Sequence, residues 1–408
     1  MRALYVSQNG MLENLGQSQV LPYLRGLAKR GVDIDLLSFE LQGALDGPIE
    51  ALRSSLTRDG IRWTPLRRRR DTRLRVKVAE SARGVLKALT MALARRPDIV
   101  HGHSYLPTAI CDVVATLVPG ARLLFDCRGM LGDEYVDAGH WTKDRSEYRL
   151  VKRYESRVFR RAEGVVVLTE ALKRWILERN WLGPETHIEA VPCCVDLDKF
   201  QFDRAARARL RSEHGLDDAF VVLYAGSLGT WYREEQLAQF AGIVKRATTR
   251  RVAFLLLTAA PPEALVELVR RQGFADQDIV TLRVPPIEMP AHLSVGDVAL
   301  SFITSCFSKK GSSPTKVAEY LACGLPVVLN GDIGDQGDLA PETDACVVLS
   351  SFDEGELTRA AALALRLGSR SMEARVRCGR QVADTHFGVE RIGVARYERL
   401  YRAMLAQR

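Results

Sequence analysis

The sequence predicts an α/β fold with two doubly wound domains, and two observations carry this prediction. Short apolar runs such as ALYVS and AFLLLTA alternate with helical stretches such as VLPYLRGLAKRG. A strand with one face in water alternates apolar and polar residues, and few of these runs do so. Continuously apolar runs are typical of parallel strands covered by helices on both sides. The alternation also stops once, near the middle of the chain, and then resumes.

The interruption predicts the domain boundary. It lies between residues 191 and 218, and a new apolar strand begins at Phe220. A chain of 408 residues is long enough for two cores. We expect a first domain over 1–195 and a second over 196–385. No strand follows the final helical stretch, 386–408, so we expect that helix to pack back on the first domain.

Ten strands follow from the apolar runs. In the first domain the runs are ALYVS (3–7), VDIDLLSFE (32–40), DIVHGHS (98–104), RLLFDCRG (122–129) and GVVVLTE (164–170). In the second they are FVVLYAGS (220–227), AFLLLTA (253–259), DIVTLRV (278–284), VALSFI (298–303) and LPVVLN (325–330). Ligands bind beyond the carboxyl ends of such strands, so the loops after them are the places to look for a site.

Composition excludes several classes of protein. Hydrophobic residues make up 47% and charged residues 26%, and no apolar run reaches the roughly 20 residues that span a bilayer. The N-terminus begins directly on a strand, without the pattern of a signal peptide, and we expect a cytoplasmic protein. The eight cysteines form no CxxC pair. We therefore expect reduced thiols and no metal site.

A basic segment runs from Arg67 to Arg96. It holds eleven basic residues against Asp71 and Glu80 only. Apolar residues recur there at helical spacing and predict one buried helix face: Leu74, Val78, Val85 and Leu89. We expect Arg73, Lys77 and Lys87 elsewhere on its surface. An anionic membrane surface, a merely solvated face and a nucleic acid are the three interpretations. No aromatic residue interleaves the arginines, so we expect no nucleic acid.

The segment GSSPTKVAEYLACGLPVVLNG (311–331) predicts an anion-binding helix start before a buried strand. Ser312 or Ser313 suits the N-cap, Pro314 suits the first helical position, and Glu319 follows one turn later. The N–H groups of this helix start would face a nucleotide diphosphate, and Glu319 would accept hydrogen bonds from ribose. An ordinary capped helix is the alternative.

Four motifs together resemble the retaining glycosyltransferases of family four (glycosyl transferases group 1). They are LGQSQVLPYLRGLAKRG (15–31), VPCCVDLDKF (191–200), AGSLGTWY (225–232) and SSPTKVAEYLACGLPVV (312–328). The resemblance implies the GT-B fold of two facing Rossmann-like domains and transfer of a sugar from a nucleoside diphosphate sugar. It implies retention of configuration without a metal or other cofactor, and SSPTKxxEYLA is similar to a branch associated with bacterial surface polysaccharides.

The resemblance and the position of each loop give three groups of candidate residues. The catalytic candidates are Lys316, Arg128 and His103. The donor-binding candidates are Gly16, Gln17, Ser227, Gly229, Thr230, Arg233, Ser312, Ser313, Thr315 and Glu319. The acceptor-side candidates are Asp126, Asp133 and Glu134. We assign no metal ligand, and we interpret the DxD sequences 33–35 and 196–198 as structural.

The chain departs from the family pattern at two places. Gly311 stands where many members carry a glutamate that contacts the transferred sugar. Ser227 and the segment 230–233 stand where many carry an arginine and a lysine beside the diphosphate. Lys316, Lys309, Lys310 or Arg233 would then supply the positive charge.

Several candidates also have a structural interpretation. Gly16 is either a phosphate-approach glycine, with Gln17 and Ser18 capping the first helix, or a plain turn glycine. Arg128 either binds substrate or pairs with Asp133. His101 is expected in the core. Trp231 and Tyr232 line the donor pocket or pack between the domains.

The leading hypothesis is a glycosyltransferase at the cytoplasmic face of the membrane that extends a lipid-linked or surface glycan. The expected partners are a nucleotide sugar, this acceptor and an anionic membrane surface. A nucleotide-sugar 2-epimerase and a noncatalytic nucleotide-binding scaffold are the alternatives.

Overall fold

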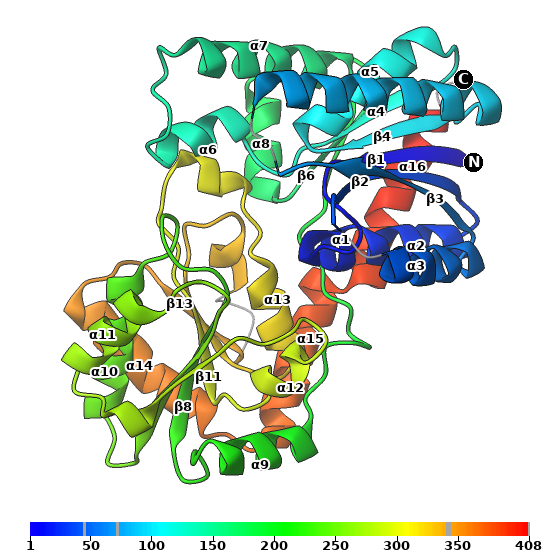
Figure 1. The fold of residues 1–408 in the computed structure, drawn as a ribbon. Coiled ribbons are helices and arrows are strands. Elements are labelled where there is room, and N and C mark those ends of the chain that lie inside the picture. Colours follow the sequence, from blue (N-terminus) through cyan, green and yellow to red (C-terminus); the bar gives the residue numbers. More distant parts are fainter. Residues whose placement is uncertain (44–45, 71–72, 340–343, 407–408) are drawn as a thin grey trace. The chain divides into compact units, whose positions relative to one another are not determined.

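The computed structural model describes residues 1–43, 46–70, 73–339 and 344–406. Asp71 and the side chain of Leu74 lie outside this description. The chain divides into two compact units: unit 1 is 1–192 with 389–408, and unit 2 is 193–388. Each unit is built on one parallel sheet (Figure 1).

The sheet of unit 1 has seven strands in the order β3-β2-β1-β4-β5-β6-β7, all parallel. The strands are β1 Arg2–Ser7, β2 Asp33–Leu41, β3 Ile61–Arg68, β4 Ile99–His103, β5 Arg122–Asp126, β6 Gly164–Val167 and β7 His187–Ala190. The chain reverses its direction of growth between β1 and β4, and ligands bind at such switch points in doubly wound sheets.

Helices cover both faces of this sheet. They are α1 Asn14–Gln19, α2 Leu21–Lys29, α3 Asp46–Arg58, α4 Leu74–Arg95, α5 Tyr105–Leu117, α6 Leu131–Asp137, α7 Ser146–Arg161, α8 Glu170–Glu178, the π-helix η4 Val389–Val394 and α16 Ala395–Ala406. On one face α4, α5 and α7 surround an apolar core that includes Leu4 and Val6 of β1. Side chains alternate along a strand, so Tyr5 faces the other side, where α16 lies.

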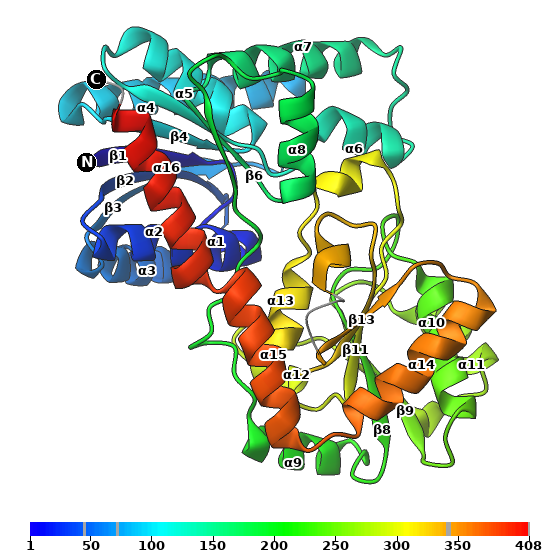
Figure 2. The same cartoon turned by 180° about the vertical axis from the view of Figure 1, so that it is seen from behind.

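The last helix belongs to unit 1, as expected for a C-terminal helix that packs back (Figure 2). It lies against β6 and β7, with Tyr397, Tyr401 and Met404 buried. The preceding turn η4 packs on α2, where a Cβ on Gly26 would lie 2.3 Å from Val394 Cγ2. Glycine at position 26 therefore allows the close approach of the two elements.

The sheet of unit 2 has six parallel strands in the order β10-β9-β8-β11-β12-β13. The strands are β8 Phe220–Ala225, β9 Val252–Leu257, β10 Ile279–Leu282, β11 Val298–Ser301, β12 Val327–Asn330 and β13 Cys346–Leu349. The predicted α/β class with two Rossmann-like sheets is confirmed.

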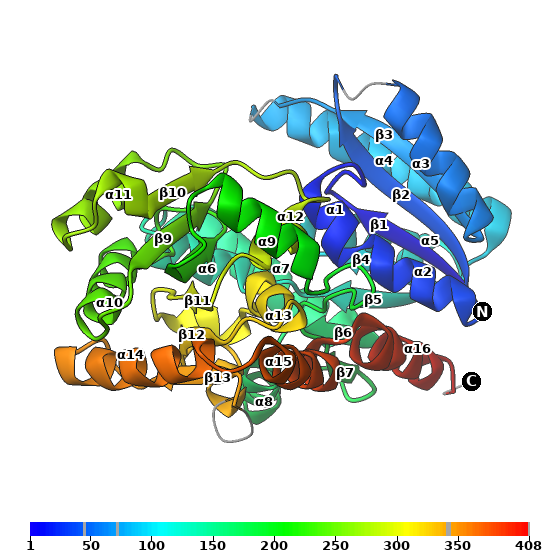
Figure 3. The ribbon, with the colours of Figure 1, turned by 90° about the horizontal axis from the view of Figure 1, so that it is seen from below.

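The helices of unit 2 also form two layers (Figure 3). They are α9 Arg204–Glu213, α10 Glu234–Arg246, α11 Glu263–Arg271, α12 Met289–Leu293, α13 Thr315–Ala322, α14 Glu354–Gly368 and α15 Met372–Phe387, with the 3-10 turns η1 Asp276–Asp278, η2 Phe307–Gly311 and η3 Gln336–Leu339. α10, α11 and α14 cover one face, and α9, α12, α13 and α15 cover the other. α13 packs directly against α15.

The basic segment does form a helix, and the predicted buried face is only partly right. Val85 and Leu89 pack against the core as predicted, whereas Val78 is 58% exposed. Gly84, Ala88 and Ala92 of α4 are buried as well, and these small residues allow α4 to approach the sheet closely. Leu86 and Leu93 are also more than half exposed.

The aspartates of both DxD sequences take part in local hydrogen bonds. The carboxylates of Asp33 and Asp35 accept hydrogen bonds from Arg62 on the neighbouring strand. Asp196 Oδ1 accepts the backbone N–H groups of Asp198 and Lys199 and thereby closes a turn.

Candidate functional site

The predicted helix start in unit 2 exists, but its cap differs from the prediction. α13 begins at Thr315 with Pro314 as its N-cap, and no side chain caps it. Ser313 Oγ instead accepts the backbone N–H of Cys193 at 3.0 Å, and Ser312 donates its own N–H to the carbonyl of Lys309. The serines are used to fix the preceding loop, so the first N–H groups of α13 have no side-chain cap.

Lys316, in the first turn of α13, reaches the loop that follows β8. Its Nζ lies 4.1 Å and 4.3 Å from the ring centroids of Tyr224 and Tyr232 and donates to the Tyr224 hydroxyl at 3.0 Å. Gly226 has a φ of 134°, and a Cβ there would lie 2.7 Å from the ammonium nitrogen. Only glycine fits this position, so helix and loop form one local site.

Two groups of this site titrate near neutrality. Burial lowers the pKa of Lys316 to about 7, and Glu319 only partly offsets it. Burial also raises the pKa of Glu319 to about 7, although Lys199 and Lys316 act in the opposite direction. An opposite charge stabilises a buried ammonium group, so an anion bound beside Lys316 would favour the protonated form of this lysine.

Lys309 is the second lysine at this loop. It lies on η2, is 7% exposed, and its Nζ is 3.6 Å from the ring centroid of Trp231. Lys310 is exposed, and Arg233 lies over Phe352 rather than over the loop. Among the four predicted charge donors, the structure therefore brings Lys316 and Lys309 to the loop after β8.

The remaining donor-side candidates lie at the same carboxyl edge. Ser227 and Thr230 are exposed, and the carbonyl of Ser227 accepts a hydrogen bond from Tyr224. Gly229 has a φ of 94°, and its N–H donates to Glu234 Oε1 at 2.6 Å. The loop is thus held by its own helix α10 while its tip stays accessible.

A buried carboxylate organises the candidate residues of unit 1. Asp126, the last residue of β5, is fully buried. Its Oδ2 lies 3.1 Å from His103 Nδ1 and 3.5 Å from His101 Nε2, and it accepts a hydrogen bond from the Tyr397 hydroxyl at 2.9 Å. Its Oδ1 lies 3.6 Å from the Arg128 guanidinium.

The electrostatics of this cluster fix its charges. Burial alone would raise the pKa of Asp126, but Arg128 and the two imidazoles hold it well below its usual range. Burial lowers the pKa values of His101 and His103, against the attraction of Asp126. At neutral pH the cluster is therefore a carboxylate beside one guanidinium and two neutral imidazoles.

Arg128 does not form the ion pair with Asp133 that was considered as an alternative. Its NH2 donates to Gln19 of α1, while Asp133 binds Lys152 at 2.8 Å. Lys152 lies on α7, so a long-range partner replaces the neighbour in sequence. Glu134 lies beside Gly129, whose φ is 154°.

His103 occupies the predicted strand end, but its side chain is only 5% exposed. Its Nδ1 lies 2.8 Å from the Tyr5 hydroxyl, in addition to its contact with Asp126. This geometry gives His103 a place in holding Asp126. His101 is a core residue, as predicted, and also contacts Tyr401.

The glycine loop after β1 differs from its predicted form. Gly16 lies inside α1, and a Cβ there would be 2.3 Å from the carbonyl oxygen of Gly10. Gln17 and Ser18 do not cap the helix, because their side chains bond the carbonyls of Met11 and Asn14. The internal packing of this loop already requires glycine at position 16.

Three residues that contact the candidate site residues were not predicted from the sequence. Tyr397 and Gln19 complete the Asp126 and Arg128 contacts, and Tyr224 holds Lys316. The sequence did hold one signal: Tyr397 and Tyr401 stand four residues apart, on one face of a helix. Within the described part of the chain, no three His, Cys, Asp or Glu side chains gather as metal ligands would.

Comparison with a family model now bears on this site. Residues 16–194 match the model of the glycosyl transferase 4-like domain. The matched part includes Gly16, His103, Asp126 and Arg128 but not Tyr397, and it is less than half of the chain.

The curated relatives are named as glycosyltransferases. A GDP-mannose-dependent alpha-(1-6)-phosphatidylinositol monomannoside mannosyltransferase of Mycolicibacterium smegmatis is 29% identical over 166 residues, 40% of this chain and 41% of that protein. A 2-deoxystreptamine glucosyltransferase of Streptomyces kanamyceticus is 27% identical over 269 residues, 64% of this chain and 66% of that protein. The chain thus spans less than two thirds of the length of each.

Solved structures share the fold of the whole chain. Anabaena HepE, in complex with UDP and glucose, superposes with a TM-score of 0.70 at 16% identity and covers 98% of this chain and 99% of its own. WaaG, a glycosyltransferase involved in lipopolysaccharide biosynthesis, gives a TM-score of 0.66 at 13% identity, with 99% and 100% covered. The chain therefore has the GT-B fold.

Proposed function

We propose that the protein is a retaining glycosyltransferase that moves a sugar from a nucleoside diphosphate sugar to a glycan acceptor. The observation that carries the proposal is the Lys316 and Glu319 pair on α13, set against the glycine-bearing loop after β8. A cation, a hydrogen-bond acceptor and uncapped helix N–H groups at a strand's carboxyl edge suit a diphosphate and a ribose.

The comparisons support the class of reaction. The relatives are named as mannosyl- and glucosyltransferases, and HepE was solved with UDP and glucose. The fold and the domain match are those of such enzymes. Nucleotide, sugar and acceptor are left to the experiments below.

In the proposed reaction the bond between the anomeric carbon and the diphosphate oxygen breaks. The acceptor oxygen bonds to the same face of the sugar, and its proton passes to the departing diphosphate. The protein then needs no strong base, and its task is to stabilise the charge that develops on the leaving group. Protonated Lys316 supplies this charge, with Lys309 behind Trp231 as the second cation. Metal ions and cofactors are not required in this proposal.

The proposed acceptor is a lipid-linked or surface glycan at the cytoplasmic face of a membrane. α4 supports contact with an anionic surface, because Val78, Leu86 and Leu93 expose an apolar stripe beside basic side chains. Among the described residues no helix is long and apolar enough to cross a bilayer. Sedimentation with phosphatidylglycerol vesicles tests this contact. Binding that does not increase with the content of anionic lipid would contradict it.

Thermal stabilisation by a panel of UDP, GDP, ADP, CMP and dTDP sugars tests the donor site. Ligands that bind only the folded protein raise its melting temperature. We expect a shift with one nucleotide class that disappears in Glu319→Ala and persists in Glu263→Ala, an exposed carboxylate of α11. No shift with any donor would contradict the proposal, and binding without turnover would favour a scaffold.

Kinetics then test the role of Lys316. We expect Lys316→Ala to lower kcat roughly 100-fold with a smaller loss of donor affinity, because its charge is needed most as the diphosphate departs. Lys29→Ala, at an exposed lysine of α2, is the control. NMR should show an unchanged anomeric configuration, and EDTA should leave the rate unaltered. Inversion at C2 of a free nucleotide sugar would instead identify an epimerase.

A further inference from the structure

A cavity of about 630 Å³ opens in unit 1 where β3 ends and α4 begins. Five arginines line it: Arg67, Arg69, Arg73, Arg75 and Arg83. Its volume lies in the range of pockets that hold small molecules. None of the residues considered above for donor binding or catalysis lines this cavity.

The cavity has an excess of positive charge. Glu80 is the only carboxylate among its described lining residues, and it already accepts the backbone N–H of Arg69 at 2.7 Å. Asp46 binds Arg67 from outside. Within the described part of the chain, Arg69, Arg75 and Arg83 form no ion pair with a carboxylate. Several guanidinium groups around one hollow repel one another, so an anion between them is favoured.

The shape of the donors narrows the class of anion. Arginine binds phosphate and carboxylate through planar, paired N–H groups, and phosphate offers more acceptor oxygens and more charge than one carboxylate. Arg67 comes from β3, Arg69 and Arg73 flank the connection to α4, and Arg75 and Arg83 lie on α4, so the lining arginines come from both elements and the segment between them. A phosphate or diphosphate group fits this arrangement.

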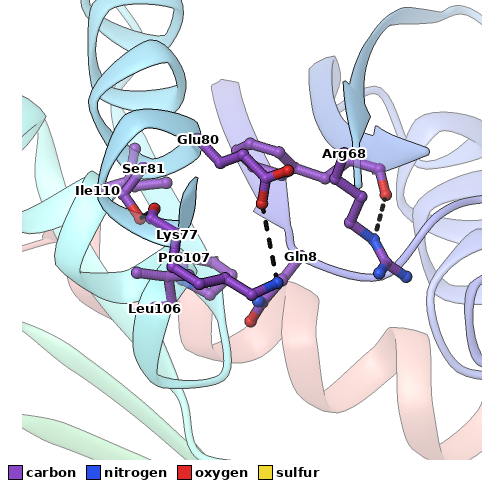
Figure 4. A pocket seen from close by; sticks show the side chains of 9 residues that line it. Gln8, Arg68, Lys77, Glu80, Ser81, Leu106, Pro107 and Ile110 are labelled. Carbon is purple, nitrogen blue, oxygen red and sulfur yellow. Dashed lines mark hydrogen bonds and ion pairs between the residues drawn. The ribbon is translucent and has the colours of Figure 1, made fainter. Parts of the chain in front are cut away.

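The cavity also lies at the edge of the sheet where the proposed chemistry takes place. Gln42 in its wall follows β2, and Arg67 and Arg69 flank the last residue of β3, so the cavity lies at the carboxyl ends of these strands. Glu80 also lines a small neighbouring hollow with Gln8, after β1, and Leu106, after β4 (Figure 4). Leu106 stands three residues after His103 in the sequence.

We propose that the arginine cavity binds a phosphate group of the acceptor, so that the acceptor is a phosphate-bearing molecule anchored at this edge of unit 1. This inference rests on the proposed glycosyl transfer for its purpose, and it adds the class of acceptor and a site for it. The phosphate belongs either to a lipid or to a soluble phosphorylated glycan, and both share the chemistry that the cavity recognises.

Hydrogen exchange measured by mass spectrometry tests the proposal on the full chain, with inorganic pyrophosphate as the soluble probe. We expect protection of peptides covering residues 67–83, and roughly a tenfold or greater rise in the concentration needed when Arg69→Gln and Arg75→Gln are combined. Arg149→Gln with Arg153→Gln removes the same charge from the exposed face of α7 and should change it by less than about twofold.

Two kinds of vesicle distinguish the source of the phosphate. Protection by phosphatidylglycerol vesicles but not by pyrophosphate assigns a lipid, and protection by pyrophosphate alone assigns a soluble phosphate. Equal protection by vesicles charged with oleate, which has no phosphate, would overturn the proposal in favour of general attraction to negative charge. Tighter binding of a short single-stranded oligonucleotide than of either probe would overturn it in favour of nucleic acid.

The same measurement separates this proposal from the proposed function. Pyrophosphate is also part of the donor, so peptides covering residues 226–233 and 312–319 report the donor site independently. Protection of the donor-site peptides without protection over 67–83 would overturn the proposed acceptor site and leave the proposed glycosyl transfer unaffected. Protection over 67–83 alone would support an anion site and count against the donor site.

Discussion

Two of the buried aspartates, one in each unit, lie among basic side chains at opposite edges of their sheets. Asp126 ends β5 in unit 1, whereas Asp297 directly precedes β11 in unit 2. Both carboxyls have a lowered pKa, because arginine outweighs the effect of burial in each. The two clusters have similar chemistry, and their positions at the two ends of parallel strands set them apart.

The Asp297 cluster is closed. Three arginines bind this carboxylate: Arg207 at 2.5 Å, Arg211 at 3.2 Å and Arg375 at 3.4 Å. The backbone N–H of Val221 also donates to it, and Arg207 donates to three backbone carbonyls as well. These bonds attach α9 and α15 to the amino edge of the sheet, where ligands seldom bind.

The Asp126 cluster is less complete. Its Oδ1 accepts no hydrogen bond within the described residues, although Arg128 is near. The comparison teaches that the number of partners and the sheet edge together separate a structural carboxylate from a functional candidate. A shifted pKa alone does not separate them, because both aspartates have one.

The largest expected effect is on stability, from Asp297→Asn. Removing this charge leaves three buried guanidinium groups without their carboxylate, and we expect a loss of about 3–5 kcal/mol in the free energy of unfolding. Urea denaturation measures it. Asp218→Asn, at an exposed ion pair with Arg251, should cost less than about 1 kcal/mol. A loss no larger than this control would remove Asp297 from its structural role.

A smaller stability effect with a larger effect on activity is expected for Asp126→Asn. The variant retains a hydrogen-bond acceptor for Tyr397 but loses the charge beside Arg128. We expect about 2 kcal/mol of destabilisation and at least about a tenfold fall in kcat with whichever donor the thermal-stabilisation panel identifies. If Asp126→Asn were as destabilising as Asp297→Asn and fully active, the distinction between the clusters would fail.

Lowering the pH should change the stability of the two units in opposite directions. The folded-state pKa values of His101 and His103 are lowered, so the unfolded chain takes up their protons first as pH falls below about 6.5. Unit 1 then loses up to roughly 1.4 kcal/mol per pH unit for each histidine. The raised pKa of Glu319, about 7, makes folded unit 2 bind the extra proton and gain stability between pH 7 and its unfolded value.

Hydrogen exchange at pH 7 and pH 5.5 measures this contrast unit by unit. Amides of β4 and β5 should exchange faster at the lower pH after correction for the intrinsic rate, relative to amides of α13. Parallel changes in both units would contradict the assignment of the neutral histidines.

The smallest effect is expected from Tyr397→Phe, which removes one hydrogen bond to Asp126 and keeps the ring packing. We expect about 1 kcal/mol of destabilisation and a fall of a few fold in kcat, with the donor affinity unchanged. Tyr401→Phe is the matched control, because its hydroxyl contacts His101 and not Asp126. Equal effects on kcat from both variants would show that Tyr397 has only a structural role.

Local sequence predicted the strands well, because an apolar run in a parallel sheet depends little on distant residues. It missed β3, β7 and β13, which are short or end in charged residues. The carboxyl-edge position of Lys316 and Arg128 was also predictable. Their partners were not, because Tyr224 lies 92 residues from Lys316 and Tyr397 lies 271 residues from Asp126. The predicted side-chain cap of α13 was wrong for the same reason, because Ser313 Oγ accepts the backbone N–H of Cys193, which is 120 residues away in the sequence.

The return of α16 to unit 1 has a consequence for how the protein is made. The ribosome completes the sheet of unit 1 some 200 residues before it synthesises Tyr397 and Tyr401, whose hydroxyls contact Asp126 and His101. Until then the Asp126 carboxylate of the nascent chain lacks the hydrogen bond from Tyr397. The Asp126 cluster is thus the last part of unit 1 to form, and a chain that ended before Tyr397 would contain both sheets without the finished cluster.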